Sequence, residues 1–376
     1  MNFGGKRLAM FGCGFEGEKL YYQMKQRGVE FDCAFDNYKS GHFHDIKIVD
    51  IGMVKESLGK WLILVSSKQY YAEIREQLVA YGLKEFDNFM PGEMFDKKLV
   101  VINANCYGPL IQTFLNSNED FVKKYYIYET IPIHANQEKK LNEIVVKKCD
   151  LFLHQDIRED NPYGYCFSDK YTSTLLKKKC ISITIPNLVG MGKAFFPQGD
   201  SNDRRNARAD MPYGMFPYSD INVEVLAQKG YGTEQIISYI KNGRTYKRSE
   251  IADKFVCVVN KFIERERNWD VKIINFILEN YKEKKVFYDI NHPTNIVLEQ
   301  IAQGILQILR IPEHPLECKC DLGRYEMPIY PEVRAALDLN YGGVKEQIRI
   351  NSSAKFMNMN MEEYIKEYIF WCNIDS

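Results

Sequence analysis

The sequence predicts an α/β protein with a small Rossmann-like N-terminal domain and a larger α/β/α domain built on a parallel sheet. Two observations lead to this prediction. Short apolar runs of strand length alternate with amphipathic helical patterns, which is typical of parallel strands covered by helices. At 376 residues the chain is also long enough for two domains. We therefore expect domains at 1–93 and 94–376, with a helical insertion at about 186–284 in the second.

The first domain shows three strand-like runs and two helical patterns. The expected strands are Lys6–Phe11, Phe31–Phe35 and Trp61–Val65, with amphipathic helices that end at Gly28 and Gly82. The run Phe89–Glu93 contains adjacent Pro and Gly, which interrupt any periodic pattern. We expect this run to be the linker between the domains.

The second domain shows five strand-like runs. They are Leu99–Ala104, Lys124–Tyr128, Asp150–His154, Cys180–Ile185 and Lys285–Ile290. Helices are expected at 136–148, 168–179, 220–230, 233–242, 248–267, 269–282, 294–309 and 361–371. Because parallel strands end at the same edge of a sheet, Asn105-Cys106, the run Gln155–Asp160 and the turn Asp289–His292 should all lie at one edge.

Composition argues against nucleic acid and membranes as partners, with a local basic patch left open. Lysine plus arginine and aspartate plus glutamate each number 50, so the net charge is zero and gives no long-range attraction for nucleic acid or anionic lipid. Without a signal-peptide pattern or a membrane-spanning apolar run, we expect a soluble cytoplasmic protein with no membrane insertion. The ten cysteines are scattered and read as reduced thiols. No metal is expected, because Cys318 and Cys320, with His314 nearby, lack a second ligand pair.

A glycine pattern follows the first expected strand. Gly12, Gly14 and Gly17 have the G-x-G-x-x-G spacing, and Asp36 ends the next strand. This context is typical of a site for a nucleotide or nucleotide-sugar, and the alternative is a glycine turn that binds no ligand. In the insertion, Arg204 and Arg205 (with Arg208) could bind a phosphorylated cofactor, or could simply be a solvated charge run.

Two turns carry residues suited to acyl transfer. The run Phe287–Pro293 ends in D-x-x-H-P, with Asp289 three residues before His292, and another expected strand is followed by Asn105 and Cys106. A nucleophile needs a base to take its proton and a third group to orient that base. We therefore interpret Cys106, His292 and Asp289 as a catalytic site, with Asn105 as a candidate to hold an oxyanion. Alternatively, Cys106 is a structural thiol, and Asp289 caps the next helix while His292 fills space.

Other polar residues follow a third strand. Gln155, Asp156 and Arg158 come directly after the run Asp150–His154, and Asn291 belongs to the D-x-x-H turn. Ligands of α/β proteins bind at the carboxyl ends of the strands, so these four residues are candidates for binding the substrate. The alternative is a solvated loop with local ion pairs.

An ordered series of motifs spans roughly residues 98–345. They are Val101–Cys106, Asp150–Arg158, Ile185–Asn187, Tyr218–Asp220, Arg265-x-x-x-Trp269-Asp270-Val271, Val286–Pro293 and Ile329-Tyr330-Pro331-x-Val333. In these motifs the chain resembles the WcbI family of polysaccharide-biosynthesis proteins, regarded as acetyltransferases of capsule assembly. The resemblance implies an SGNH-hydrolase-like or flavodoxin-like domain that binds coenzyme A or acetyl-coenzyme A. The D-x-x-H turn is also similar to the last motif block of SGNH/GDSL esterases, although this chain has Asn105-Cys106 where those enzymes carry Gly-Asp-Ser.

We therefore expect an acetyltransferase that moves an acetyl group from acetyl-coenzyme A to a sugar hydroxyl in bacterial surface polysaccharide, either capsular polysaccharide or exopolysaccharide. His292, oriented by Asp289, would act on Cys106 or directly on the acceptor hydroxyl, and Gln155 and Arg158 would position the acceptor or the cofactor. The partner would be a small-molecule or oligosaccharide substrate, and a homo-oligomer stays open. The alternatives are an SGNH-type carbohydrate esterase using the same residues and a non-catalytic protein that binds a nucleotide-sugar.

Overall fold

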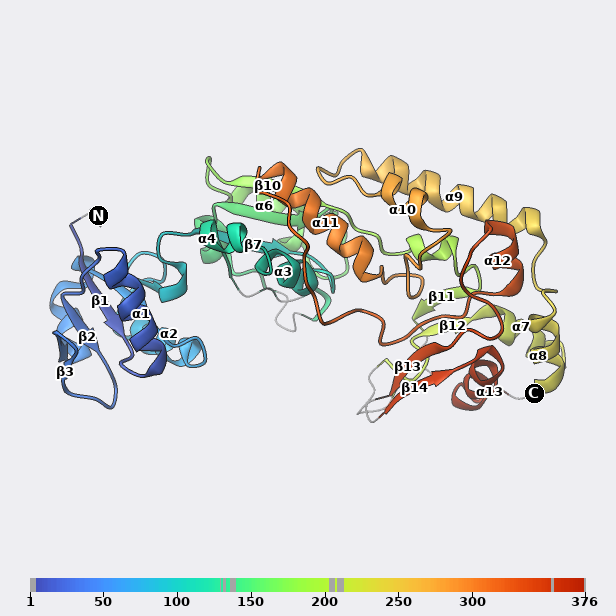
Figure 1. Cartoon of the computed structure of the whole chain (residues 1–376), viewed down its shortest axis with the longest axis horizontal. Helices are drawn as coiled ribbons and strands as arrows, with labels where there is room; N and C mark the ends of the chain where they lie inside the picture. Colours follow the sequence, from blue (N-terminus) through green and yellow to red (C-terminus); the bar gives the residue numbers. More distant parts are fainter. Residues whose placement is uncertain are drawn as a thin grey trace.

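The structure is a computed structural model that describes residues 5–128, 130, 133–135, 140–202, 207, 213–352 and 355–374. Arg204, Arg205 and Arg208 lie outside the described residues. The chain is elongated, with the N-terminal unit at one end, a second sheet in the middle and the C-terminal elements at the other end (Figure 1). None of the described helices combines the length and the apolar character that crossing a bilayer requires.

The N-terminal unit is a twisted sheet with helices on it. In chain order its elements are β1 (Arg7–Phe11), α1 (Phe15–Gln26), β2 (Cys33–Phe35), β3 (Gly41–Phe43), β4 (Ile46–Val49), β5 (Trp61–Val65), α2 (Tyr71–Ala80) and β6 (Phe89–Pro91). The strand order is β3-β4-β2-β1-β5-β6, and all pairs are parallel except β3 with β4. The three expected strands and both helices are confirmed, whereas β3 and β4 are too short to show a clear pattern.

The expected linker was wrong. Phe89–Pro91 is a strand whose Phe89 pairs with Ile63 of β5. Phe89 is fully buried, and Gly92 packs against Leu20 of α1. Proline is tolerated here because β6 is an edge strand, so its missing N–H breaks no ladder bond. The run therefore closes the first sheet instead of leaving it.

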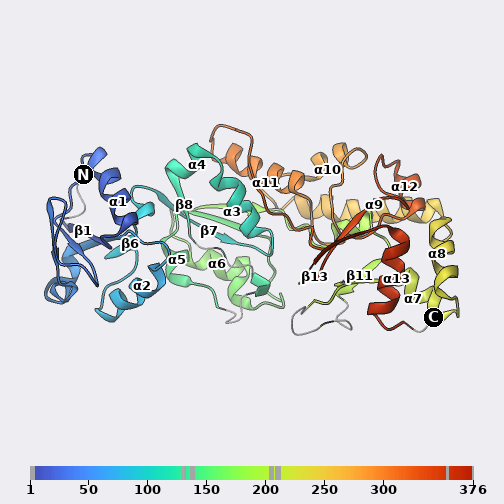
Figure 2. The ribbon, with the colours of Figure 1, turned by 60° about the horizontal axis from the view of Figure 1, so that its bottom comes forward.

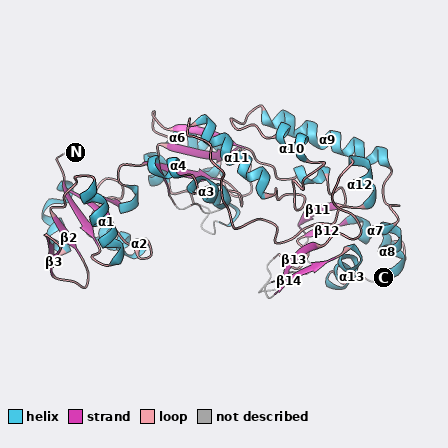
Figure 3. Cartoon of the chain, viewed as in Figure 1, coloured by secondary structure: helices cyan, strands magenta, loops and turns pink. Residues whose placement is uncertain are grey.

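The second sheet has four parallel strands in the order β10-β9-β7-β8. They are β7 (Lys98–Asn103), β8 (Tyr125–Ile127), β9 (Leu151–Gln155) and β10 (Ile181–Ile185), and between them lie α3 (Gly108–Asn116), α4 (Glu119–Lys124), α5 (Glu143–Lys148) and α6 (Asp169–Leu175). One face packs against α3 and against α11 (Asn295–Ile308), and the other packs against α5 and α6. Figures 2 and 3 show the strands between these helices. The α/β class with a helix-covered parallel sheet is confirmed.

The fifth expected strand, Lys285–Ile290, was wrong. This segment pairs with no strand of the sheet and forms one isolated antiparallel bridge, between Phe287 and Pro293. Backbone groups of this segment form hydrogen bonds with loops instead of with a strand. Tyr288 N–H donates to the carbonyl of His292, and Gly192 N–H donates to the carbonyl of Ile290. The D-x-x-H turn therefore approaches the sheet as a loop, and β10 stays an edge strand.

The insertion and the C-terminal segment form a further layer at the far end of the molecule (Figure 1). Its elements are β11 (Gly199–Asn202), β12 (Tyr218–Asp220), α7 (Ile221–Gln228), α8 (Thr233–Lys241), α9 (Arg248–Glu266), α10 (Ile274–Asn280), α12 (Pro331–Leu337), β13 (Ile348–Ser352), β14 (Lys355–Met359) and α13 (Met361–Trp371). The expected helices of this region are present, although α10 is shorter than expected. Short 3₁₀ helices occur at Ile51–Lys60, Gly92–Met94, Ile133–Ala135, Tyr165–Phe167 and Met191–Ala194.

A buried carboxylate connects the insertion to the C-terminal segment. Asp220 is fully buried and caps α7, where its side chain accepts the N–H groups of Asn222 and Val223. The hydroxyl of Tyr330 donates to both carboxylate oxygens at 2.9 Å, and Asp220 N–H donates to the hydroxyl of Tyr368. Burial raises the pKa of Asp220 to about 7, although the hydrogen bonds oppose this change.

This carboxylate should make stability depend on pH. Because the pKa of Asp220 lies above its ordinary value of 3.8, the folded chain keeps a proton that the unfolded chain loses between about pH 4 and pH 7. The free energy of unfolding should fall as the pH rises through this window, by at most roughly 4 kcal/mol at ~1.4 kcal/mol per pH unit. Asp220→Asn keeps a capping oxygen but does not ionise, so its stability should lack this fall.

Urea unfolding across this pH range measures the effect. The exposed Asp253 offers a matched control, and Asp253→Asn should follow the wild type. Parallel pH profiles for Asp220→Asn and the wild type would contradict the assignment.

Candidate active site

The D-x-x-H turn is organised by its own carboxylate. Asp289 is fully buried, and one of its oxygens accepts the N–H groups of Asn291 and His292 at 2.7 and 2.9 Å. Its other oxygen lies 2.7 Å from Nδ1 of His292. The capping residue of α11 is Thr294, so Asp289 does not cap that helix. The carboxylate instead sets both the backbone of the turn and the orientation of the imidazole, which leaves Nε2 available to another group.

Neighbouring loops hold this turn in place. A Cβ added to Gly192 would lie 2.0 Å from the carbonyl oxygen of Asp289, so only glycine permits this approach. The side chain of Asn291 accepts Gly190 N–H and donates to the hydroxyl of Tyr218. Tyr107 donates its hydroxyl to the carbonyl of Asn291 at 2.9 Å. Asn291, a predicted substrate-binding residue, thus has both ends of its side chain engaged in fixing the turn.

Cys106 lies on the turn between β7 and α3. Its neighbour Asn105 accepts Tyr107 N–H through its side-chain oxygen, and Gly108 N–H donates to the carbonyl of Asn105. Pro109 occupies the first turn of α3, whose N-terminus therefore begins just after the thiol. The Cys106 thiol is half-buried. Among the described residues, neither the Cys106 N–H nor the Asn105 side-chain amide nitrogen has a hydrogen-bond partner.

The tertiary fold brings the Cys106 thiol within hydrogen-bonding reach of His292, although the two residues lie far apart in the sequence. Burial disfavours the charged imidazole, but the charge and hydrogen bond of Asp289, together with the adjacent Cys106 thiol, outweigh it and raise the pKa of His292 to about 10. His292 is therefore an imidazolium at neutral pH. A thiol beside an imidazolium at a helix N-terminus is the arrangement that activates a cysteine nucleophile.

The three substrate-binding candidates at the end of β9, Gln155, Asp156 and Arg158, differ from one another in burial and in hydrogen-bond partners. Gln155 is buried, and it accepts Asn105 N–H at 2.9 Å and donates to the carbonyl of Pro186 at 3.1 Å. It therefore positions the turn that carries Cys106. Asp156 is half-buried near Arg265. Arg158 is exposed and pairs with Asp160, so the structure does not bring it to the cysteine and histidine.

Several residues of the site were missed by the sequence reasoning. Arg265, in the last turn of α9, packs its guanidinium over Phe262 and Trp269. Burial lowers the pKa of Arg265, and the charges of Asp156 and Tyr107 oppose this change. Its guanidinium forms no ion pair with a described carboxylate, which leaves a half-buried cation beside the site. The motif Arg265-x-x-x-Trp269 contained this signal, because an arginine four residues before a tryptophan can stack on it.

Three tyrosines also belong to this region. The hydroxyl of Tyr218 lies 3.5 Å from Nδ1 of His292. Burial and the nearby charges of Cys106 and Tyr213 raise the pKa of Tyr163. Tyr163 and Tyr213 are 37% and 48% exposed, so an accessible ring lies near the thiol in Tyr163 and a second one lies near Tyr163 in Tyr213. The sequence did not indicate these tyrosines as site residues, because they belong to loops that are far from Cys106 and His292 along the chain.

The glycine loop of the N-terminal unit is closed by its own chain. A Cβ on Gly17 would lie 2.2 Å from the carbonyl oxygen of Gly12, whose φ is +98°. Gly14 precedes α1 and has open space around it. Asp36 accepts the N–H groups of Cys13, Tyr38 and Lys39. These contacts explain Gly12, Gly17 and Asp36 without a ligand, and a nucleotide at this loop stays a prediction.

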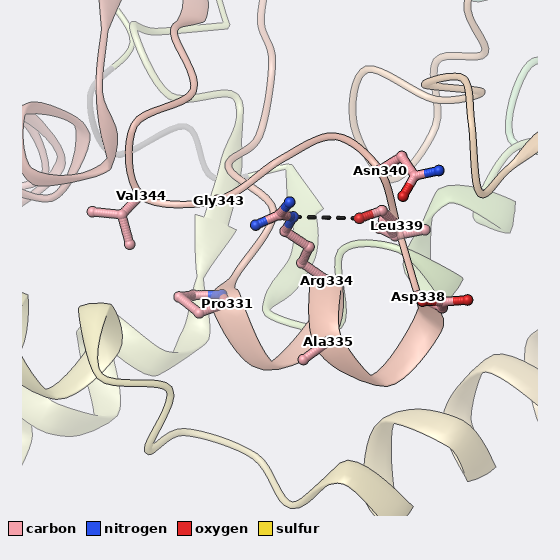
Figure 4. A pocket seen from close by; sticks show the side chains of 8 residues that line it. All are labelled: Pro331, Arg334, Ala335, Asp338, Leu339, Asn340, Gly343 and Val344. Carbon is pink, nitrogen blue, oxygen red and sulfur yellow. Dashed lines mark hydrogen bonds between the residues drawn. The ribbon is translucent and has the colours of Figure 1, made fainter.

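No group of three described side chains has the arrangement of a metal site. A pocket of about 370 Å³ lies beside α12 (Figure 4). There Arg334 donates to the carbonyl of Leu339 at 3.3 Å, so its guanidinium stabilises the end of the helix. None of the described catalytic candidates lines this pocket.

The pKa of His292 should depend on Asp289. Asp289→Asn removes the charge that offsets burial, so the pKa of His292 should fall by about 1 to 3 pH units or more. In the wild type, this raised pKa contributes stability that is present below about pH 6.5 and is lost as the pH rises through about 10. Histidine NMR titration measures both forms, with His292→Gln to assign the signal.

A second histidine–carboxylate contact provides the control. His154 Nδ1 lies 3.0 Å from Asp169, and Asp169→Asn should leave the titration of His292 unchanged. An unaltered His292 pKa in Asp289→Asn would refute the role of the carboxylate.

Comparison with known proteins identifies the family of this chain. The family model described as "Polysaccharide biosynthesis enzyme WcbI" matches residues 99–314, which is more than half of the chain. A solved structure of WcbI, described as a novel polysaccharide biosynthesis enzyme, aligns with a TM-score of 0.63 and 19% sequence identity, covering 74% of this chain and 90% of that one. No curated protein matches the chain. The match over the domain that carries Cys106 and His292 shows that the chain belongs to the WcbI family of polysaccharide biosynthesis enzymes.

Proposed function

We propose that this enzyme transfers an acetyl group from acetyl-coenzyme A to a sugar hydroxyl through Cys106. The observation that carries the proposal is the juxtaposition of a half-buried thiol with an imidazolium that Asp289 orients. These are the three parts of a nucleophilic acyl-transfer site. The family's description as a polysaccharide biosynthesis enzyme supports a sugar as the acceptor.

Coenzyme A is proposed as the carrier of the acetyl group. The related WcbI structure is described as the native protein without a disulfide bond between coenzyme A and a cysteine. In this chain, Arg265 is a half-buried cation without a described carboxylate partner, which suits a phosphate of the cofactor. The cofactor supplies acetyl as a thioester, whose carbonyl needs a nucleophile and a donor for its developing charge.

The residues of the site can carry out the transfer in two steps. In the first, the thiolate of Cys106 attacks the acetyl carbonyl carbon, the bond to the leaving sulfur breaks, and His292 gives its proton to that sulfur. In the second, the neutral imidazole takes a proton from the sugar hydroxyl as the hydroxyl oxygen attacks the acetylated Cys106. The thiolate leaves, and His292 is again an imidazolium. The net change moves acetyl from sulfur to oxygen and a proton from the hydroxyl to the departing thiol.

The turn before α3 can stabilise the charge on the carbonyl oxygen. The N–H of Cys106 and the side-chain amide of Asn105 have no described hydrogen-bond partner, and both belong to the residues at the nucleophile. Donors aimed at such an oxyanion can each contribute ~100-fold or more to the rate. Gln155 holds Asn105 N–H and so keeps this turn in register with β9.

The accessible rings of Tyr163, near Cys106, and of Tyr213, near Tyr163, suit the acceptor. Aromatic faces pack against the apolar face of a sugar ring, while hydroxyl groups at their edges donate and accept hydrogen bonds. In this proposal the sugar binds at the solvent side of the thiol, where its hydroxyl would meet the acetylated sulfur.

The covalent route predicts a trapped intermediate. Wild-type protein incubated with acetyl-coenzyme A without acceptor, then acid-quenched, should gain the mass of one acetyl group. Cys106→Ala should gain none and should lose acetyl transfer by more than ~10³-fold. Asp289→Asn should still bind the cofactor but should transfer acetyl ~10²- to 10⁴-fold more slowly, since its histidine no longer holds the proton.

Cys257→Ala is the matched control, because this thiol is exposed on α9 and lies far from both residues of the pair in the sequence, and the variant should acetylate normally. Undiminished acetyl transfer by Cys106→Ala would refute a covalent intermediate. Release of acyl groups from sugar esters without any requirement for coenzyme A would instead identify an esterase.

A further inference from the structure

A large cavity lies between the N-terminal unit and the second sheet. Its volume is about 650 Å³, and its walls come from the loop after β5, the first turns of α2, the end of β6, α3 and the edge strand β8. None of the described residues proposed for acetyl transfer lines it. The volume falls within the roughly 300–1,000 Å³ typical of small-molecule sites.

The topology of the N-terminal sheet places this cavity next to a switch point. From β1 the chain adds β2 and β4 on one side, and it then crosses to add β5 and β6 on the other. Ligands of open α/β sheets bind outside the carboxyl ends of the strands at such a point. The glycine loop after β1 is occupied by Asp36, and Ser66 donates its hydroxyl to the carbonyls of Phe11 and Gly12. The space that remains open is therefore on the β5–α2 side.

Unpaired cations line this space. Neither Lys68 nor Lys97 makes an ion pair or a side-chain hydrogen bond with any described residue. Lys97 is half-buried, and burial lowers its pKa despite the nearby charge of Glu93. Arg75 also faces the cavity but is bound to the buried Glu85 at 2.6 Å. An exposed ammonium group of Lys68 and a half-buried one of Lys97 in the lining of one cavity favour an anionic ligand such as a phosphate.

The opposite wall of the cavity is lined by aromatic rings and side-chain amides instead of cations. The edge strand β8 contributes tyrosines, and α3 contributes the amides of Gln112 and Asn116. Tyr128 donates its hydroxyl to Glu85, which fixes the orientation of its ring. Aromatic rings beside amide donors and acceptors are suited to a ring that carries several hydroxyl groups.

We propose that this cavity binds a phosphorylated sugar, with the phosphate at Lys68 and Lys97 and the sugar against β8 and α3. The cavity joins the N-terminal unit, which the family match does not cover, to the domain that it does cover. A polysaccharide-assembly enzyme works among phosphorylated sugars, so the site would give the N-terminal unit a ligand related to the pathway. This proposal does not depend on the acetyl-transfer mechanism.

Calorimetric titration of the full chain tests the proposal with UDP-glucose, glucose 1-phosphate, UDP and glucose as probes. At least one phosphorylated sugar should bind, and glucose should not. Lys68→Gln and Lys97→Gln should each weaken that binding ~10-fold or more, the usual effect of losing a charge-assisted hydrogen bond. Ala72→Tyr fills the cavity from an exposed position of α2 without changing charge, and it should also abolish binding.

Lys47→Gln is the matched control, because Lys47 is exposed on β4 and does not line the cavity. It should bind the probes like the wild type, as should Cys106→Ala. Binding of glucose 1-phosphate would identify a sugar phosphate as the ligand, and binding of UDP-glucose but not of glucose 1-phosphate would identify a nucleotide sugar.

Four outcomes would overturn the proposal. They are no binding of either phosphorylated sugar at millimolar concentration, equal affinity for UDP and UDP-glucose, displacement of the sugar probe by coenzyme A, and unchanged affinity in the two lysine variants. Loss of acetyl transfer in Cys106→Ala has no bearing on these measurements, so the two proposals fail separately.

Discussion

The close approach of Gly192 to the carbonyl of Asp289 is the constraint on which the site depends. The D-x-x-H turn belongs to no sheet, so no ladder of backbone hydrogen bonds determines its place. Its position comes from the glycine contact, from the engagement of Asn291 with Gly190, and from the hydroxyl of Tyr107. Since Tyr107 directly follows Cys106, the same contacts set the histidine relative to the thiol. Rigid support of this kind lets two loops hold a reactive pair.

Within that support, the charge of the imidazole is decided by two opposing effects. Burial alone would make His292 neutral at physiological pH, whereas the buried carboxylate of Asp289 at 2.7 Å makes it cationic. Among the described residues, His292 is the cation that pairs with the Asp289 carboxylate, so the imidazolium balances the buried negative charge. A stored proton beside a thiol is suited first to an acid role, and the base role follows only after that proton has been given away. The order of the two steps follows from this electrostatic balance.

The glycine loop of the N-terminal unit has structural roles for its motif residues that need no ligand. Gly12 and Gly17 serve the tight turn and the packing of α1, and Asp36 binds the loop's own N–H groups. A carboxylate in that position would repel the phosphates that such a loop binds elsewhere. The cations without partners lie instead at the cavity between the units. The spacing of the glycines alone therefore does not establish a ligand site, and the hydrogen bonds and charges around the loop have to be considered as well.

Local patterns were sufficient for much of this structure. The strands β1, β5, β9 and β10, the helices α9, α11 and α13, and the bonding of Asp289 to His292 all follow from short-range periodicity and turn chemistry. The fifth strand was wrong because an apolar run of strand length is equally suited to a buried loop, and only its packing against Gly192 decides between them.

What the sequence by itself determined was therefore the class of the fold, the thiol at the end of β7 and the local carboxylate–histidine turn. The sequence also predicted that the turn meets the thiol, but only the tertiary structure decided that the turn does so as a loop, that Gln155 supports the Cys106 turn, and that Arg265 rather than Arg158 lies at the site. The physical reason is the distance along the chain over which each effect acts. Backbone periodicity and turns act over a few residues, whereas the burial and charge that make a site come from loops that packing brings together.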